Sequence, residues 1–130
     1  MKFYCTLLRS QGLFYFLTGI WPLVHIQSFM LVTGRKFDIW LVKTVGLLII
    51  ACSLGMLAAS FRKYIQPDVL LIMLGFAGFL AAVDIYYVAT DVISPVYLAD
   101  AAVELVLMLI WIYWWIKIKP NANQNRVNTV

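Results

Sequence analysis

The stretch Ile39–Phe61, IWLVKTVGLLIIACSLGMLAASF, decides the fold class, because its 23 residues contain one charged side chain, Lys43. A transmembrane helix needs about 20 consecutive, predominantly apolar residues to cross the hydrocarbon core of a bilayer. Arg62 and Lys63 end the run, as cationic residues commonly do at the membrane surface. The stretch therefore predicts a membrane-spanning helix from about residue 39 to residue 61.

The composition of the whole chain extends this conclusion. Of the 130 residues, 64% are hydrophobic and 12% are charged, whereas a soluble domain is about half apolar and about a quarter charged. These values exclude an ordinary soluble enzyme, a disordered chain and a nucleic-acid-binding module. The net charge of +4 comes from residues that flank apolar runs, so we expect the lipid bilayer as partner and no nucleic acid.

Three further apolar runs are similar in length to the run 39–61. In chain order with that run as the second, they are the first, about 12–32, which Pro22 interrupts, the third, 69–89, and the fourth, 96–116. The run 12–32 is too long for the apolar region of a signal peptide, so we expect an uncleaved transmembrane helix there. Connections of about six residues place consecutive helices side by side and antiparallel. The sequence thus predicts an all-α, up-down-up-down, four-helix membrane bundle over residues 1–119. The polar segment 120–130 is predicted to be a disordered cytoplasmic tail.

The distribution of Lys and Arg predicts the orientation. In a multi-pass protein, the short loops on the cytoplasmic side carry the excess of these residues. One side would hold seven and the other only Arg35 and Lys36; the seven are Lys2, Arg9, Arg62, Lys63, Lys117, Lys119 and Arg126. We therefore expect a plasma-membrane or inner-membrane protein with both termini in the cytoplasm.

Small residues predict where the helices touch. Ala51, Gly55 and Ala59 recur at a spacing of four in the second run, and Ala77 and Ala81 do so in the third. Such residues let helix backbones approach closely in lipid. The spacing predicts packing faces, and it leaves open a homo-oligomer or another membrane protein as partner.

Five ionisable residues lie inside the predicted spans, and all of them come from the half nearer the outer surface. At about 1.5 Å per residue, each lies roughly 6–12 Å below that surface. They are His25, Lys43, Asp84, Asp100 and Glu104. Because a charge is costly inside a bilayer, we expect these side chains to face inward, to meet one another or to line a wet cavity.

Helical spacing groups these residues with particular neighbours. Asp84 shares a face with Ala77 and Ala81, and Glu104 shares one with Asp100. Lys43 supplies one positive charge against three carboxylates. The predicted layer must therefore hold protons, bind a cation or receive a basic or polar ligand.

Three functions fit this layer. The first is a site for a small ligand, a proton or a cation, in which the identity of any metal is unknown. The second is a structural or accessory subunit of a larger membrane complex, with an ion-pair layer that sets helix register. The third is an enzyme that uses His25 with Asp84 or Glu104 as an acid/base pair on a lipid-soluble substrate. No motif in the sequence indicates a cofactor.

Each polar residue also has a plainer explanation. Lys43 is close enough to the surface for its ammonium group to reach water. Asp100 is shallow enough to be an interfacial charge near a helix N-terminus. His25 follows Pro22 by three residues and could serve backbone groups that the proline leaves unbonded. Asp84 and Glu104 lie deeper, so they carry most of the functional hypothesis.

Overall fold

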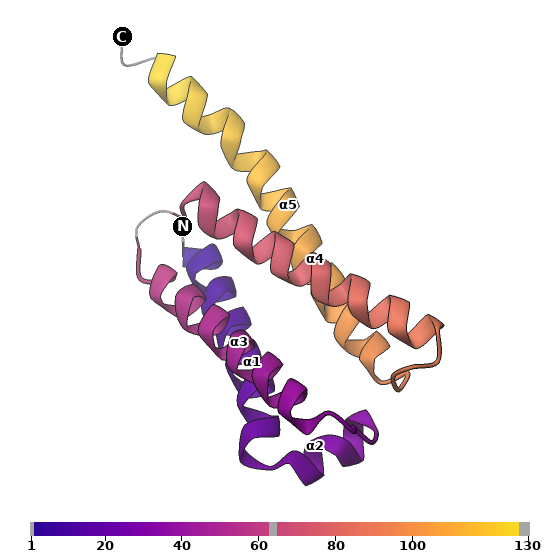
Figure 1. Ribbon diagram of the computed structural model, residues 1–130. Coiled ribbons are helices and arrows are strands. Elements are labelled where there is room, and N and C mark those ends of the chain that lie inside the picture. Colours follow the sequence, from indigo (N-terminus) through magenta and orange to yellow (C-terminus); the bar gives the residue numbers. More distant parts are fainter. Residues whose placement is uncertain (1, 63–64, 128–130) are drawn as a thin grey trace. The chain divides into compact units, whose positions relative to one another are not determined.

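The computed structural model describes residues 2–62 and 65–127, with side chains from residue 3 to residue 117 within those ranges. The elements are α-helices, and this part of the chain contains no β-strand (Figure 1). In order they are α1 (Lys2–Val24), α2 (Ile26–Thr33), α3 (Ile39–Ala59), α4 (Pro67–Ala89) and α5 (Tyr97–Val127). The predicted all-α class is confirmed.

Three of the described helices are long and apolar enough to cross a membrane. They are α3, α4 and the part of α5 from Tyr97 to Lys117. Helices α1 and α2 meet the same criterion only when taken together, and they are bent by 113° at the break between them. The described part of the chain thus has three candidate spans, or up to four if the bent pair counts as one, as expected for a membrane protein.

The first apolar run differs from the single helix predicted over residues 12–32. Helix α1 already begins at Lys2, and it continues through Pro22 to Val24. The chain leaves helical geometry at His25, whose φ is −145° and ψ is 79°. The run is therefore not one unbroken helix. The interruption expected at Pro22 lies three residues later, at His25, the residue that precedes α2. The span formed by α1 and α2 together stays a prediction.

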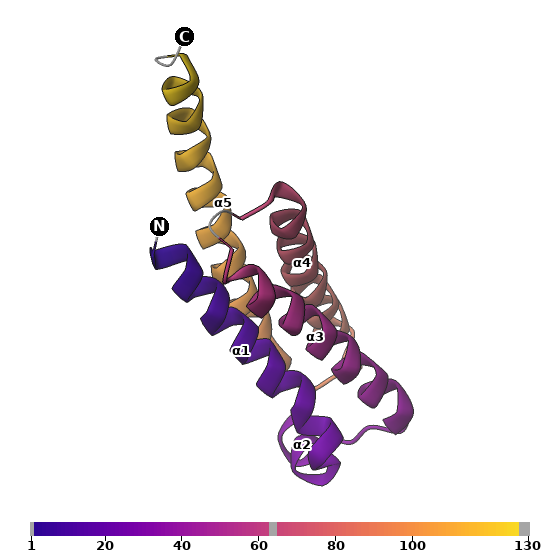
Figure 2. The same ribbon diagram turned by 90° about the vertical axis from the view of Figure 1, so that its left-hand side faces the viewer.

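The chain divides into two compact units, and the first comprises residues Met1–Val69. In this unit α1 and α3 lie side by side and antiparallel, and α2 turns away at the end of α1 (Figure 2). The two long helices touch through their backbones. A Cβ atom added to Gly19 would lie 2.7 Å from the carbonyl oxygen of Gly46, and one added to Gly46 would lie 2.6 Å from that of Gly19. Only glycine at both positions permits this approach.

Gly12, about two turns before Gly19 in α1, continues the contact with α3. A Cβ added to Gly12 would lie 3.0 Å from Cγ of Leu57 and 3.4 Å from the carbonyl oxygen of Ser53. Gly12 and Gly19 are seven residues apart, as are Gly46 and Ser53. A repeat of seven keeps one face of a helix toward its neighbour over two turns. The α1–α3 seam therefore follows a seven-residue repeat.

This seam is not the contact face that the sequence predicts for the second run. Ala51 and Gly55 are exposed, and a Cβ added to Gly55 would meet nothing within 4 Å. Ala59 is buried. The predicted spacing of four therefore does not describe the α1–α3 contact at Ala51 and Gly55, and their role in another contact stays a prediction. The physical reason is that α1 packs against a different face of α3, the one that carries Gly46 and Ser53.

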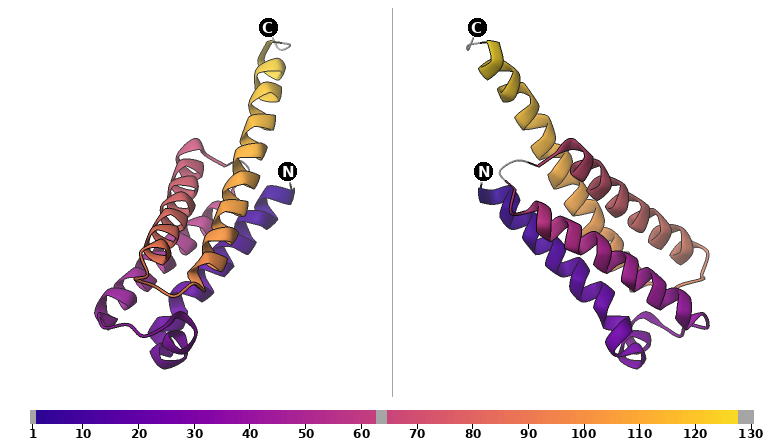
Figure 3. Two further views of the ribbon diagram at one scale, coloured as in Figure 1. Left: turned by 90° about the vertical axis from the view of Figure 1, so that its right-hand side faces the viewer. Right: turned by 60° about the vertical axis from the view of Figure 1, so that its left-hand side comes forward.

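The second unit comprises residues Leu70–Val130 and contains α5 and nearly all of α4. The two helices form an antiparallel hairpin joined at one end by the loop 90–96 (Figure 3). A Cβ added to Gly78 of α4 would lie 3.6 Å from Sδ of Met108 in α5, which is ordinary van der Waals contact. The buried residues of α4 follow helical spacing along one face: Leu70, Met73, Ala77, Ala81 and Asp84. This is the face that the sequence predicts for Asp84.

Helix α5 extends to Val127. It therefore includes residues 120–127 of the polar segment whose composition predicts a disordered tail. The last three residues of that segment, 128–130, lie outside the described residues.

The seam gives a first prediction. Replacing Gly46 with Ala should destabilise the protein by about 1–3 kcal/mol, because the new methyl group would force the backbones of α1 and α3 apart. Gly55→Ala is the matched control. It should be neutral or stabilising by up to about 1 kcal/mol, since alanine favours the helix and the site is open. Unfolding of the purified proteins by a denaturing detergent measures both changes. Equal stability of the two variants would contradict the close contact.

Candidate functional site

Two aspartates come together at the loop end of the α4–α5 hairpin. Asp84 lies five residues before the end of α4, and Asp100 lies three residues after the start of α5. The antiparallel arrangement brings both positions to the same level. Their carboxyl groups lie within hydrogen-bonding reach of each other. The structure thus forms a carboxyl pair from two helices, Asp84 and Asp100, both of which the sequence placed in the predicted polar layer without naming them as a pair.

The surroundings of Asp84 make this pair unusual. The side chain is 7% exposed, and its Oδ2 is buried without a hydrogen-bond donor among the described residues. An ionised carboxylate is only an acceptor, so two ionised aspartates cannot hydrogen-bond to each other. A hydrogen bond between them requires one proton on one of the carboxyl groups. The pair can therefore hold a shared proton, or a cation in the place of that proton.

Glu104 extends the acidic face by one turn of α5. It is four residues after Asp100 and only 1% exposed. Farther along the same face, Trp111 is also 1% exposed, and its ring meets that of Trp114 edge-on at 5.8 Å between centroids. The face of α5 thus changes from carboxylates near the loop to large aromatic side chains farther away. The acidic side chains of α5 are therefore confined to the end of the helix near the loop.

His25 has a local structural role at the break between α1 and α2. Its Nδ1 accepts a hydrogen bond from the backbone N–H of Ser28 at 3.1 Å, which caps the N-terminus of α2. The hydroxyl of Ser28 donates to the carbonyl oxygen of His25 at 3.0 Å and accepts from Nε1 of Trp21 at 2.9 Å. The structure therefore favours the plainer interpretation of His25, in which it serves backbone groups near Pro22.

Lys43 lies four residues after the start of α3, and its side chain is exposed. It belongs to the first unit together with His25, whereas the three carboxylates belong to the second. Of the five predicted site residues, the structure brings together Asp84 and Asp100, with Glu104 on the next turn of α5. The extension of this site to His25 and Lys43 stays a prediction.

Sequence reasoning missed one polar contact entirely. Nε of Arg9 in α1 donates to Oγ of Ser60 at 3.3 Å, and the guanidinium group lies 4.8 Å from the centre of the Phe61 ring. The two segments are 51 residues apart, so no local spacing could reveal the contact. The Trp21–Ser28 hydrogen bond, in contrast, joins residues only seven apart in the sequence, on either side of the break at His25.

Neither a metal centre nor a known relative adds to this geometry. Within the described ranges, no group of three or more His, Cys, Asp or Glu residues could hold a metal ion. Comparison with known proteins finds no matching family model, no matching curated protein and no matching solved structure. The functional argument therefore depends on the residues themselves.

The capping role of His25 predicts a specific pair of variants. His25→Ala should destabilise the protein by about 0.5–2 kcal/mol, because the N–H of Ser28 loses its acceptor. His25→Asn should retain most of the stability, since the asparagine side chain is a strong N-cap. Unfolding by a denaturing detergent distinguishes the two. If the asparagine variant is as unstable as the alanine variant, His25 does not act as a cap.

Proposed function

We propose that this chain is a small multi-pass membrane protein that binds a proton at the Asp84–Asp100 pair and exchanges it for a small monovalent cation. The observation that carries the proposal is the buried Oδ2 of Asp84, which lacks a donor although a second carboxyl group lies beside it. A structural carboxylate is normally satisfied by protein donors. An oxygen without a donor is ready for a proton or a cation.

The charge balance of the pair favours exchange of the bound proton for a monovalent cation. Two ionised carboxylates in contact repel each other strongly, and the cost rises where water is excluded. One bound proton reduces the charge of the pair from −2 to −1. One monovalent cation bound between the two carboxylates has the same effect. Cation binding therefore releases the proton to water, and the charge of the pair stays at −1.

Glu104 gives this site a third carboxylate, one turn of α5 away from Asp100. It lies one turn from Asp100 and is buried. A proton or cation that leaves the pair toward the aromatic end of α5 would meet this carboxylate next. We therefore include Glu104 in the proposed site as a further acceptor, with Asp84 and Asp100 as the primary ligands.

We place the site in a four-helix, up-down-up-down bundle in the plasma or inner membrane, with both termini in the cytoplasm. The support is the excess of Lys and Arg, seven against two, on the side of the termini. The acidic pair then lies in the half of the membrane that faces outward. Ions or protons from the outer medium would reach it first.

The geometry favours binding over the enzymatic alternative. An acid/base mechanism requires His25 to accept a proton from a substrate. In the structure, Nδ1 of His25 already accepts the N–H of Ser28. The imidazole is thereby committed to the cap of α2. The accessory-subunit alternative is tested by the experiment below.

Proton release on cation addition tests the proposal. Sodium chloride added to the lightly buffered, detergent-solubilised protein should release up to about one proton per chain, because the ion replaces the shared proton. Choline chloride, whose cation is too large for the pair, should release none. Asp84→Asn and Asp100→Asn should each abolish the release, because the remaining carboxylate no longer faces a second negative charge that holds a proton at the pair. A pH-indicator dye measures the change.

Asp91→Asn provides the matched control. Asp91 is exposed in the loop at a φ of 57°, a conformation that asparagine also tolerates, so this variant should release protons as the wild type does. No release from the wild type, or equal release from all variants, would overturn the proposal. If Asp84→Asn and the Asp84→Asn/Asp100→Asn double variant unfold while Asp91→Asn does not, the pair serves the fold, as the accessory-subunit alternative requires.

A further inference from the structure

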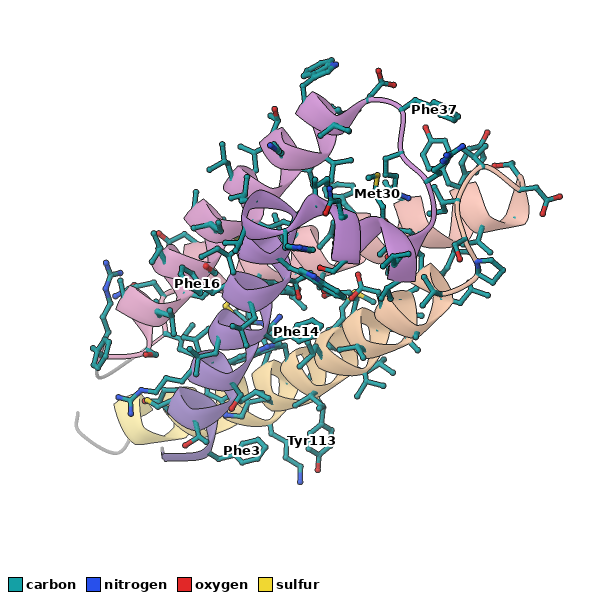
Figure 4. The ribbon with its side chains drawn as sticks, turned by 90° about the horizontal axis from the view of Figure 1, so that it is seen from below. Phe3, Phe14, Phe16, Met30, Phe37 and Tyr113 are labelled. Carbon is teal, nitrogen blue, oxygen red and sulfur yellow. The ribbon has the colours of Figure 1, made fainter. Side chains whose placement is uncertain are left out.

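Helix α2 and the segment after it present large apolar side chains that their own unit does not cover. Leu31 is 86% exposed, Phe37 is 91% exposed and Trp40 is 68% exposed. Phe37 projects from the loop away from the neighbouring ribbon (Figure 4). These residues follow one another over ten positions of the chain. A surface of this kind in a membrane protein requires an apolar covering.

Helix α1 is by itself long enough to reach across a hydrocarbon core, although it meets the criterion for a candidate span only together with α2. The 23 residues of α1 measure about 34 Å at 1.5 Å per residue, against a hydrocarbon core of about 30 Å. The 113° bend turns α2 23° past the perpendicular to α1. If α1 stands upright in the bilayer, α2 lies close to the membrane plane, with its far end tilted back toward the lipid.

The bend is held by specific contacts and is not a loose connection. His25 caps α2 through Ser28, and Trp21 donates to the hydroxyl of Ser28. The ring of Trp21 also meets that of Phe29 edge-on, with 5.6 Å between centroids. Residues from both sides of the break thus fix the direction of α2. This local network operates within the first unit alone.

The end of α2 combines cations with aromatic side chains. Gly34 ends the helix with a φ of 88°, which favours glycine, and Arg35 and Lys36 follow. Nζ of Lys36 donates to the carbonyl oxygen of Thr33 at 3.2 Å, which holds this ammonium group at the helix end. Arg35 is exposed. Aromatic residues concentrate where lipid tails meet headgroups, and cations there attract anionic headgroups.

We propose that α2, the loop 34–38 and the first residues of α3 lie along the interface of one leaflet and bind anionic phospholipid headgroups. Leu31, Phe37 and Trp40 enter the boundary of the acyl region, and Arg35 and Lys36 contact the headgroup phosphates. The opposite charges of the cations and the phosphates identify the occupant as an anionic lipid surface. The proposal does not depend on the Asp84–Asp100 site, which belongs to the other unit.

Depth measurements test the placement of α2. In a Cys5→Ser/Cys52→Ser background, nitroxide labels at Gln27→Cys and Leu31→Cys occupy exposed positions one turn apart. For a helix in the membrane plane, electron paramagnetic resonance with oxygen and nickel relaxants should give the two labels similar depths in phospholipid vesicles. A helix that continues the span would separate them by about 6 Å.

Leu41→Cys and Val45→Cys provide the control for depth, since they are exposed one turn apart on α3, a candidate span. Their labels should differ by about 6 Å. A similar difference between residues 27 and 31 would overturn the proposal. So would labels at both positions that contact only the aqueous relaxant, because α2 would then lie outside the lipid and its apolar surface would require a protein partner.

Headgroup binding is tested with spin-labelled phosphatidylglycerol in vesicles of phosphatidylcholine. Neutralising the cations with Arg35→Gln and Lys36→Gln should lower the association of this anionic lipid by about five-fold per charge at that site, because each cation near the surface contributes attraction of this order. Arg62→Gln, an exposed cation beyond the other end of α3, is the control. It should leave association at the α2 site unchanged, as read from relaxation between the lipid label and a label at Leu31→Cys. Equal association in all variants would overturn headgroup binding.

Discussion

The need to satisfy backbone polar groups within the helices governs this structure. In a bilayer, no water is at hand to bond a stray N–H or carbonyl group. The short polar side chains follow the same rule. The hydroxyls of Thr18, Thr33, Thr44 and Thr90 each donate to the carbonyl oxygen four residues earlier. At the sharp break between α1 and α2, His25 and Ser28 supply hydrogen bonds for backbone groups that the interrupted helix leaves unbonded.

Asp84 departs from this rule, because its buried Oδ2 has no hydrogen-bond donor among the described residues. This departure is the reason to consider a functional role for Asp84. A hydroxyl or an imidazole can be satisfied by the backbone of its own helix, as the threonines and His25 are. A buried carboxylate of a helix interior cannot, because nearby N–H groups are already engaged in the helix. Asp84 meets instead the carboxyl group of Asp100, another acceptor. A proton or a cation must therefore balance the negative charge of this pair. This requirement connects the fold to the proposed function.

The close approach of α1 and α3 connects the packing of the first unit to its bend. Besides the backbone of Gly19, Gly46 faces Pro22, whose Cγ would lie 3.4 Å from a Cβ at position 46. The proline therefore packs against α3 within the seam, and α1 stays helical through it. The break comes at His25, one turn beyond this contact. Packing against α3 keeps α1 helical as far as this contact extends. The cap at His25 then sets the direction of α2.

The sequence by itself determined the helical class, the membrane character and the burial of Asp84 with Ala77 and Ala81, because composition and helical spacing are local properties. The tertiary structure decided what depends on partners. It placed α1 against the face of α3 around Gly46. Residue spacing alone cannot show which of several faces with small residues makes this contact. The tertiary structure moved the break from Pro22 to His25, since the cap forms only when the chain folds back. It also paired Asp84 with Asp100, because the register between two helices is set by their packing and their loop, not by either helix alone.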